Sequence, residues 1–194
     1  MAPASREGSG DGAAPARPTG PYPVGLAALL VTVGMLFAAL TATLLVRRTG
    51  ADWSRIALPR ILYVNTGILA LSSVAVETAR AAIRRDRSGS ASRHLGIAAA
   101  LGLLFLVGQA VAWQRLRSAG LLLASGPYVA YVYLLSALHG AHVLGGLGAL
   151  EWTRRRARQG RYTARRHAGL RHAAAYWHFV GGIWLYLLAL LSLA

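Results

Sequence analysis

The chain has 194 residues, of which 55% are hydrophobic and only 14% charged. Soluble domains carry about 25% charged residues, so this composition argues against a soluble domain. The formal net charge of +15 comes from 21 basic residues, all of them arginine, and no cysteine is present. Disulfides and thiolate-ligated metal sites are therefore excluded. Because the arginines lie between apolar blocks, nucleic-acid binding is not expected.

Five apolar blocks follow an N-terminal segment that is rich in Ala, Pro, Gly and Ser. Residues 1–23 show no apolar periodicity, so we expect a disordered tail there. A helix that crosses a membrane needs about 20 apolar residues. We therefore predict an all-α integral membrane protein in which residues 24–194 form one five-helix domain. The expected spans are residues 24–46, 61–83, 95–113, 128–150 and 173–194.

Arginine is distributed unevenly between the two sides of these spans. Fifteen of the 21 arginines fall in the N-terminal segment and in the loops after the second and fourth spans. Cytoplasmic loops carry an excess of basic residues, so the N-terminus is predicted to be cytoplasmic and the C-terminus external. Anionic lipid headgroups or an acidic partner surface could meet the densest group, although retention of topology alone would also explain it. This group comprises Arg154, Arg155, Arg156, Arg158 and Arg161.

The acidic and histidine residues inside the predicted spans are Glu77, His139, His142 and His178. Glu77, His142 and His178 are expected about 8–12 Å deep from the cytoplasmic side, so they could meet. The three histidines could bind a haem or metal ion, or they could make hydrogen bonds between helices. Hydrogen bonding is favoured because three histidines are too few for a haem-copper site. We predict that Glu77 lies in the bundle interior, bonded to His142 or His178.

Small and aromatic residues accompany these histidines. Gly140, Gly145 and Gly146 on the fourth span favour close helix packing. Tyr176 and Trp177 lie near a predicted span end, where aromatic belts form. The spacing of these residues alone does not indicate a catalytic or binding role for either group.

Three segments resemble one known family. Residues 136–146 read SALHGAHVLGG, similar to the T-G-x-H-G-x-H-V-x-G-G segment of subunit III of haem-copper terminal oxidases. Residues 176–184 read YWHFVGGIW, similar to its Y-W-H-F-V-D-x-x-W signature, and the N-T and S-S pairs of residues 65–73 are similar to a third stretch. The matching positions include Asn65, Thr66, His139, Gly140, His142, Gly145, Gly146, Tyr176, Trp177, His178, Phe179 and Trp184.

The resemblance, to the short five-helix form of the family, implies a subunit without a redox metal of its own. Haem and copper are expected in partner subunits I and II of an oxidase of the cytochrome c type. The chain is expected to pack beside the catalytic subunit in a bacterial plasma membrane. It would hold phospholipid in a V-shaped cleft and support proton uptake and stability during turnover.

Three family carboxylates are replaced, at Gly181, near Val33 and at Arg60. This divergence leaves an alternative open, an accessory subunit of a nitric oxide reductase or another divergent haem-copper complex. An alternative of another class is a stand-alone histidine-ligated membrane haem or metal enzyme, or a small transporter.

Overall fold

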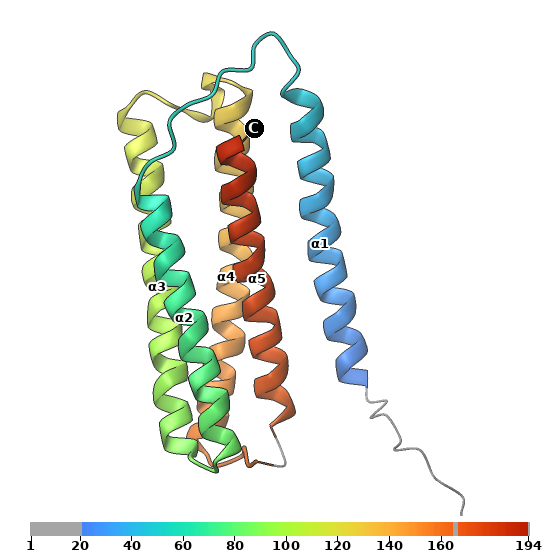
Figure 1. The fold of residues 1–194 in the computed structure, drawn as a ribbon, viewed down its shortest axis with the longest axis vertical. Helices are drawn as coiled ribbons and strands as arrows, with labels where there is room; N and C mark the ends of the chain where they lie inside the picture. The colour runs from blue at the N-terminus through green and yellow to red at the C-terminus, as the bar shows by residue number, and fades with distance from the viewer. Residues whose placement is uncertain (1–20, 165–166, 194) are drawn as a thin grey trace, which may run out of the picture.

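The computed structural model describes residues 21–164 and 167–193, which form long α-helices without strands (Figure 1). Five helices in this part of the chain are long and apolar enough to cross a membrane, so the predicted fold class is confirmed. A short 3₁₀ turn, η1 (Leu123–Ser125), precedes the fourth helix. The helices are α1 (Pro21–Arg47), α2 (Ile61–Arg84), α3 (Ser88–Ser118), α4 (Pro127–Arg158) and α5 (Ala168–Leu193).

Several helices extend beyond the predicted spans. The α3 helix has 31 residues and α4 has 32, because their arginine-containing ends continue the helix past the apolar stretch. A helix of this length measures about 46–48 Å, which exceeds the roughly 30 Å hydrocarbon core. Residues 1–20 of the predicted tail lie outside the described residues, whereas residues 21–23 begin α1.

Proline and glycine mark the helix ends. Pro127 stands in the first turn of α4, where its missing N–H costs no intrahelical hydrogen bond. Gly120 follows α3 with φ +76° and Gly160 follows α4 with φ +67°. This left-handed conformation is common just after a helix and is least costly for glycine. These residues therefore set where the long helices stop.

The turn between α2 and α3 contacts the loop that follows α4. Asp86 in this turn has a φ of 55°, a left-handed conformation that aspartate tolerates better than most residues. Its Oδ1 accepts a hydrogen bond of 2.7 Å from the backbone N–H of Ala164. The two arginine-rich connections are thus joined at one end of the molecule.

The helices α2, α3, α4 and α5 form a closed four-helix bundle. Each packs against the next along the chain, and α5 returns to contact α2. The α1 helix has only small contacts with α4 and α5, and it stands apart from the bundle (Figure 1). The four helices therefore form the closely packed part of the fold, and α1 packs beside it through Val33, Phe37 and Leu44.

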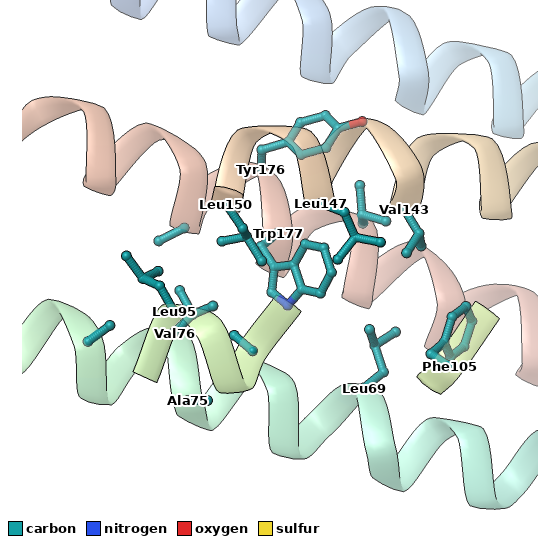
Figure 2. Close-up of a cluster of buried hydrophobic side chains, with 14 of the residues drawn as sticks. Leu69, Ala75, Val76, Leu95, Phe105, Val143, Leu147, Leu150, Tyr176 and Trp177 are labelled. Atoms are coloured by element: carbon teal, nitrogen blue, oxygen red, sulfur yellow. The ribbon is translucent and has the colours of Figure 1, made fainter. Parts of the chain in front are cut away.

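Trp177 of α5 lies at the centre of the bundle with 1% of its surface exposed. Its ring contacts α3 at Gly102 and α4 at Gly146, because a Cβ at either position would lie within 3.0 Å of ring carbons. Leu147 and Leu150 belong to the same buried cluster (Figure 2). In lipid, close van der Waals packing of this kind drives helix association.

Polar side chains join the helices inside the bundle. Ser72 of α2 donates a 2.8 Å hydrogen bond to the carbonyl oxygen of Ala98 in α3. The indole N–H of Trp184 in α5 donates to Thr66 Oγ1 in α2 at 3.0 Å. Pairing of this kind is favourable because hydrocarbon cannot hydrogen-bond these groups.

We expect Gly102→Ala to destabilise the bundle, because the new methyl group would lie 2.7 Å from Trp177 Cη2 and 2.8 Å from Leu147 Cδ2. Overpacking of this kind costs about 1–3 kcal/mol. Gly67→Ala is the matched control, since a Cβ there meets nothing within 4 Å and gains the same helix propensity. Thermal unfolding in detergent, followed by circular dichroism, measures both. Equal stability of the two variants would contradict the role of the glycine contact.

Candidate functional site

His139 of α4 is packed among aromatic rings in the bundle interior. It is 1% exposed, and its ring centroid lies 5.1 Å from that of Trp184 and 5.7 Å from that of Phe105. Within the described part of the chain, neither ring nitrogen of His139 has a hydrogen-bond partner. His139 therefore fills space between α3 and α5.

His142 lies one turn further along α4 and contacts different helices. Its Nδ1 donates a 2.7 Å hydrogen bond to the carbonyl oxygen of Leu138, and its ring lies 5.5 Å from Phe37 of α1. The hydroxyl of Tyr176 donates to the carbonyl oxygen of His142 at 3.1 Å. His142 thus lies at the contact of α1, α4 and α5.

The three histidines do not form one metal site. His139 packs against Phe105 and Trp184, whereas His178 of α5 bonds to a carboxylate on α2. No group of three or more His, Cys, Asp or Glu in the described residues could hold a metal ion. Their contacts instead tie helices together.

Glu77 of α2 makes the predicted bond to His178. The Nε2–H of His178 donates to Glu77 Oε1 at 2.7 Å, so this part of the prediction is confirmed. Arg80, one turn along α2, also donates to both carboxylate oxygens, at 2.7 and 3.0 Å. His142 is not a partner of Glu77. The cluster is therefore a carboxylate held between an imidazole and a guanidinium.

The predicted burial of Glu77 in the bundle interior is wrong. Its side chain is 45% exposed and that of His178 is 36% exposed on the chain alone. Both line an open hollow of about 490 Å³ between α2 and α5, together with Ser73 and Arg84. Depth along a helix predicts the layer in which a side chain lies, but not the direction in which it points.

A cleft separates α1 from α4 and α5 at the arginine-rich end of the molecule. Its volume is about 780 Å³. Most of its walls are apolar, while the Arg156 guanidinium lies 4.8 Å above the Trp152 ring at its rim. The residues lining this cleft include Leu26, Leu29, Gly145, Ala149, Trp152, Arg156, Tyr162, His172 and Tyr176.

The arginines at the end of α4 point to different surroundings. Arg156 faces the cleft, whereas Arg154 and Arg158 line a separate groove against α3. Arg155 is exposed and shares the Glu151 carboxylate with Arg154. Arg161 is exposed in the loop after α4. The predicted headgroup contacts therefore divide over different faces of α4 and the loop that follows it.

The remaining signature residues lie at helix contacts. Asn65 Nδ2 is 3.4 Å from the carbonyl oxygen of Phe105. The Asn65 side chain lies directly against Gly108, where a Cβ would clash with it. A Cβ at Gly140 would lie 3.7 Å from Leu106 Cδ2. The Phe179 ring lies 3.7 Å from the Cβ position of Gly34 in α1. These residues stabilise packing between α2 and α3, α3 and α4, and α1 and α5.

The replaced carboxylates lie in three different places. At Gly181 a Cβ would lie 3.8 Å from Ser73 Oγ, so a side chain there would face α2. Val33 is 3% exposed in the apolar contact of α1. Arg60 is exposed just before α2, at the end opposite the cleft.

Sequence reasoning did not single out several lining and packing residues. Leu26 and Leu29 are ordinary span residues, and only the position of α1 places them in the cleft. Tyr162 has a buried hydroxyl without a hydrogen-bond partner among the described residues. Gly102 carries no pattern beyond that of a glycine in an apolar helix. Two features of the sequence could have pointed to residues of this set. Tyr162 comes shortly after a glycine that ends a helix, and His172 lies near a span end.

Comparisons with known proteins agree along most of the chain. Residues 25–193 match the family described as Cytochrome c oxidase subunit III. Cytochrome c oxidase subunit 3 of Synechocystis sp. is 33% identical over 175 residues, which cover 87% of this chain and 74% of the relative. The protein of that name from Thermostichus vulcanus is 34% identical over 176 residues, covering 87% and 85%. The one from Cyprinus carpio is 33% identical over 124 residues, covering 64% and 46%.

We expect Glu77→Leu to lower the free energy of unfolding by about 1 kcal/mol, because His178 and Arg80 both lose their acceptor. Partial exposure keeps this cost at the low end of the range for charged groups. Glu77→Gln keeps an acceptor oxygen and should lose less than half as much. Unfolding in mixed detergent measures both. If the two variants were equally stable, the bond between α2 and α5 would contribute nothing.

Proposed function

The chain belongs to the cytochrome c oxidase subunit III family, and from this membership we propose that it is a non-catalytic subunit of a cytochrome c oxidase. The observation that carries the proposal is the family match over residues 25–193, which runs through all five membrane helices. Haem and copper would reside in partner subunits I and II. The chain is a multi-pass membrane protein, and we place it in a bacterial plasma membrane.

The contacts of the histidines support a non-catalytic role. A haem or copper site needs imidazole nitrogens that converge on one point. His139 is enclosed by Phe105 and Trp184, while His178 gives its Nε2 to Glu77. Each imidazole is thus engaged separately in packing or in a hydrogen bond between helices.

The cleft beside α1 supports a role in lipid binding. Its walls from Leu26, Leu29 and Ala149 suit an acyl chain. Arg156 and His172 at its rim suit a phosphate headgroup. A lipid held there would fill the space between α1 and the bundle, so it would stabilise the subunit beside its catalytic partner.

The Glu77 cluster supports a role in proton uptake. Glu77 lies seven residues before the end of α2, about 10 Å from the predicted cytoplasmic end. Its carboxylate is partly exposed and hydrogen-bonded to the titratable His178. Ionisable groups inside a membrane span are costly, and such residues can belong to ion or proton routes. The cluster could exchange protons near the surface where a catalytic partner takes them up.

Affinity purification from native membranes tests the proposed assembly. With a tag at the C-terminus of this chain, we expect a haem-containing catalytic subunit and copper to co-elute in mild detergent. The eluate should consume oxygen. Elution without a haem protein would contradict the proposal, and nitric oxide reduction without oxygen consumption would favour the other haem-copper complex. Another tagged multi-pass protein of the same membrane is the control.

Purified alone in full length, this chain should show no Soret absorption and no stoichiometric iron or copper. The reason is that its imidazoles are directed at different neighbours. Metal analysis and visible spectroscopy of His139→Leu and His178→Leu should match those of the unchanged chain. A haem spectrum that disappears in either variant would contradict the non-catalytic assignment.

A further inference from the structure

A second hollow lies between the ends of α3 and α4 at the arginine-rich end, outside the cleft. This groove has a volume of about 610 Å³. Three guanidinium groups, from Arg93, Arg154 and Arg158, line it together with small or apolar residues of α3. It therefore combines concentrated positive charge with an apolar floor.

The positive charge in this groove is largely uncompensated. The Arg154 Nε and Nη2 donate to the Glu151 carboxylate at 2.6 and 2.9 Å. Glu151 also accepts from Arg155, so one carboxylate serves two guanidinium groups. Arg93 and Arg158 have no ion pair or hydrogen bond from their side chains to other described residues. An anion is the ligand that this arrangement lacks.

Glu151 also orients Arg154 toward the groove. Two of its nitrogens are occupied by the carboxylate, and the remaining Nη1 lies 4.0 Å from the Cβ position of Gly96 in α3. The free edge of the guanidinium therefore faces the floor of the groove. Held in this way, Arg154 loses little side-chain entropy when it binds an anion.

The groove and the cleft lie on different faces of α4. Successive helix residues turn by about 100°, so positions two apart point in nearly opposite directions. Arg154 and Arg158 line the groove, whereas Trp152 and Arg156 line the cleft. A ligand in one hollow cannot use the arginines of the other.

We propose that this groove binds the phosphate of an anionic phospholipid, with an acyl chain on its apolar floor. Arg93, Arg154 and Arg158 contact the phosphate. Gly96, Ile97 and Ala100 line the path of the chain toward the membrane centre. Arginine suits this role because its planar donors match phosphate oxygens. The site goes beyond the proposed lipid cleft, which lies against α1.

The depth of the floor favours a lipid over an acidic surface of another protein. Ala100 lies seven residues beyond Arg93 along α3, about 10 Å deeper in the membrane. An acidic loop at the membrane surface would neutralise the arginines but leave this apolar stretch empty. A phospholipid supplies both the charge and the chain, so its chemistry fits the whole length of the groove.

Native mass spectrometry of the delipidated full-length chain in detergent tests this site. Dioleoyl phosphatidylglycerol is the anionic probe, dioleoyl phosphatidylcholine the zwitterionic probe, and inorganic phosphate the competitor. We expect preference for phosphatidylglycerol. Arg93→Gln with Arg158→Gln should weaken the tightest binding event about tenfold or more. The control Arg85→Gln with Arg171→Gln removes equal charge from the same end outside the groove, so it should preserve that event.

A second variant tests the floor without changing charge. A Cβ at Gly96 would make ordinary contact with Arg154 Cδ at 3.6 Å, so Gly96→Leu should fold and fill the acyl path. It should weaken phosphatidylglycerol binding, whereas Gly67→Leu, on an open surface, should not.

Each of the following results would overturn the lipid site. These are equal binding of the two lipids, equal loss in the control double variant, and displacement of phosphatidylglycerol by equimolar inorganic phosphate. Unchanged binding in both Gly96→Leu and the Arg93/Arg158 variant would also do so. Because the measurement uses this chain alone, its failure leaves the proposed oxidase assembly to be judged by co-purification.

Discussion

Hydrocarbon offers no hydrogen bonds to a polypeptide, and this constraint shapes every part of the chain. The backbone is satisfied within five helices that cross the membrane. Some buried polar side chains bond across helices, as Ser72 does to Ala98 and Trp184 does to Thr66. The charged residues gather at the helix ends or, like Glu77, find partners on a neighbouring helix. These polar residues therefore link neighbouring helices through hydrogen bonds.

The second consequence of the apolar solvent is that association depends on close packing. The Trp177 ring fits against Gly102 and Gly146, which lets α3, α4 and α5 approach one another. The α1 helix packs on α4 and α5 through the buried side chains of Val33, Phe37 and Leu44, whereas Leu26 and Leu29 nearer its start line an open space. This space between α1 and the bundle is the cleft. The same physics thus produces a closely packed bundle beside an open, largely apolar cleft.

Hydropathy predicted the number and order of the helices because each span must be apolar for about 20 residues. Hydropathy underestimated the lengths of α3 and α4, since their arginine-containing ends continue the helix beyond the apolar stretch. The depth estimated along each helix correctly predicted that Glu77 meets His178. It does not give the rotation of a side chain about the helix axis, so the exposure of Glu77 was predicted wrongly. His139 and His142 differ by about 60° around α4, enough to face different neighbours. The cleft depended on the placement of α1, which no local pattern encodes.

The most direct measurement of the central claim is an electron cryomicroscopy map of the complex isolated through this chain. The central claim is that four helices pack tightly while lipid fills the cleft between α1 and the bundle, beside a catalytic subunit. We predict acyl-chain density against Leu26, Leu29 and Ala149, and haem density only in the neighbouring chain. A map in which α1 lies directly along α4, with side chains filling that space, would contradict the claim. So would haem bound by His139 or His178.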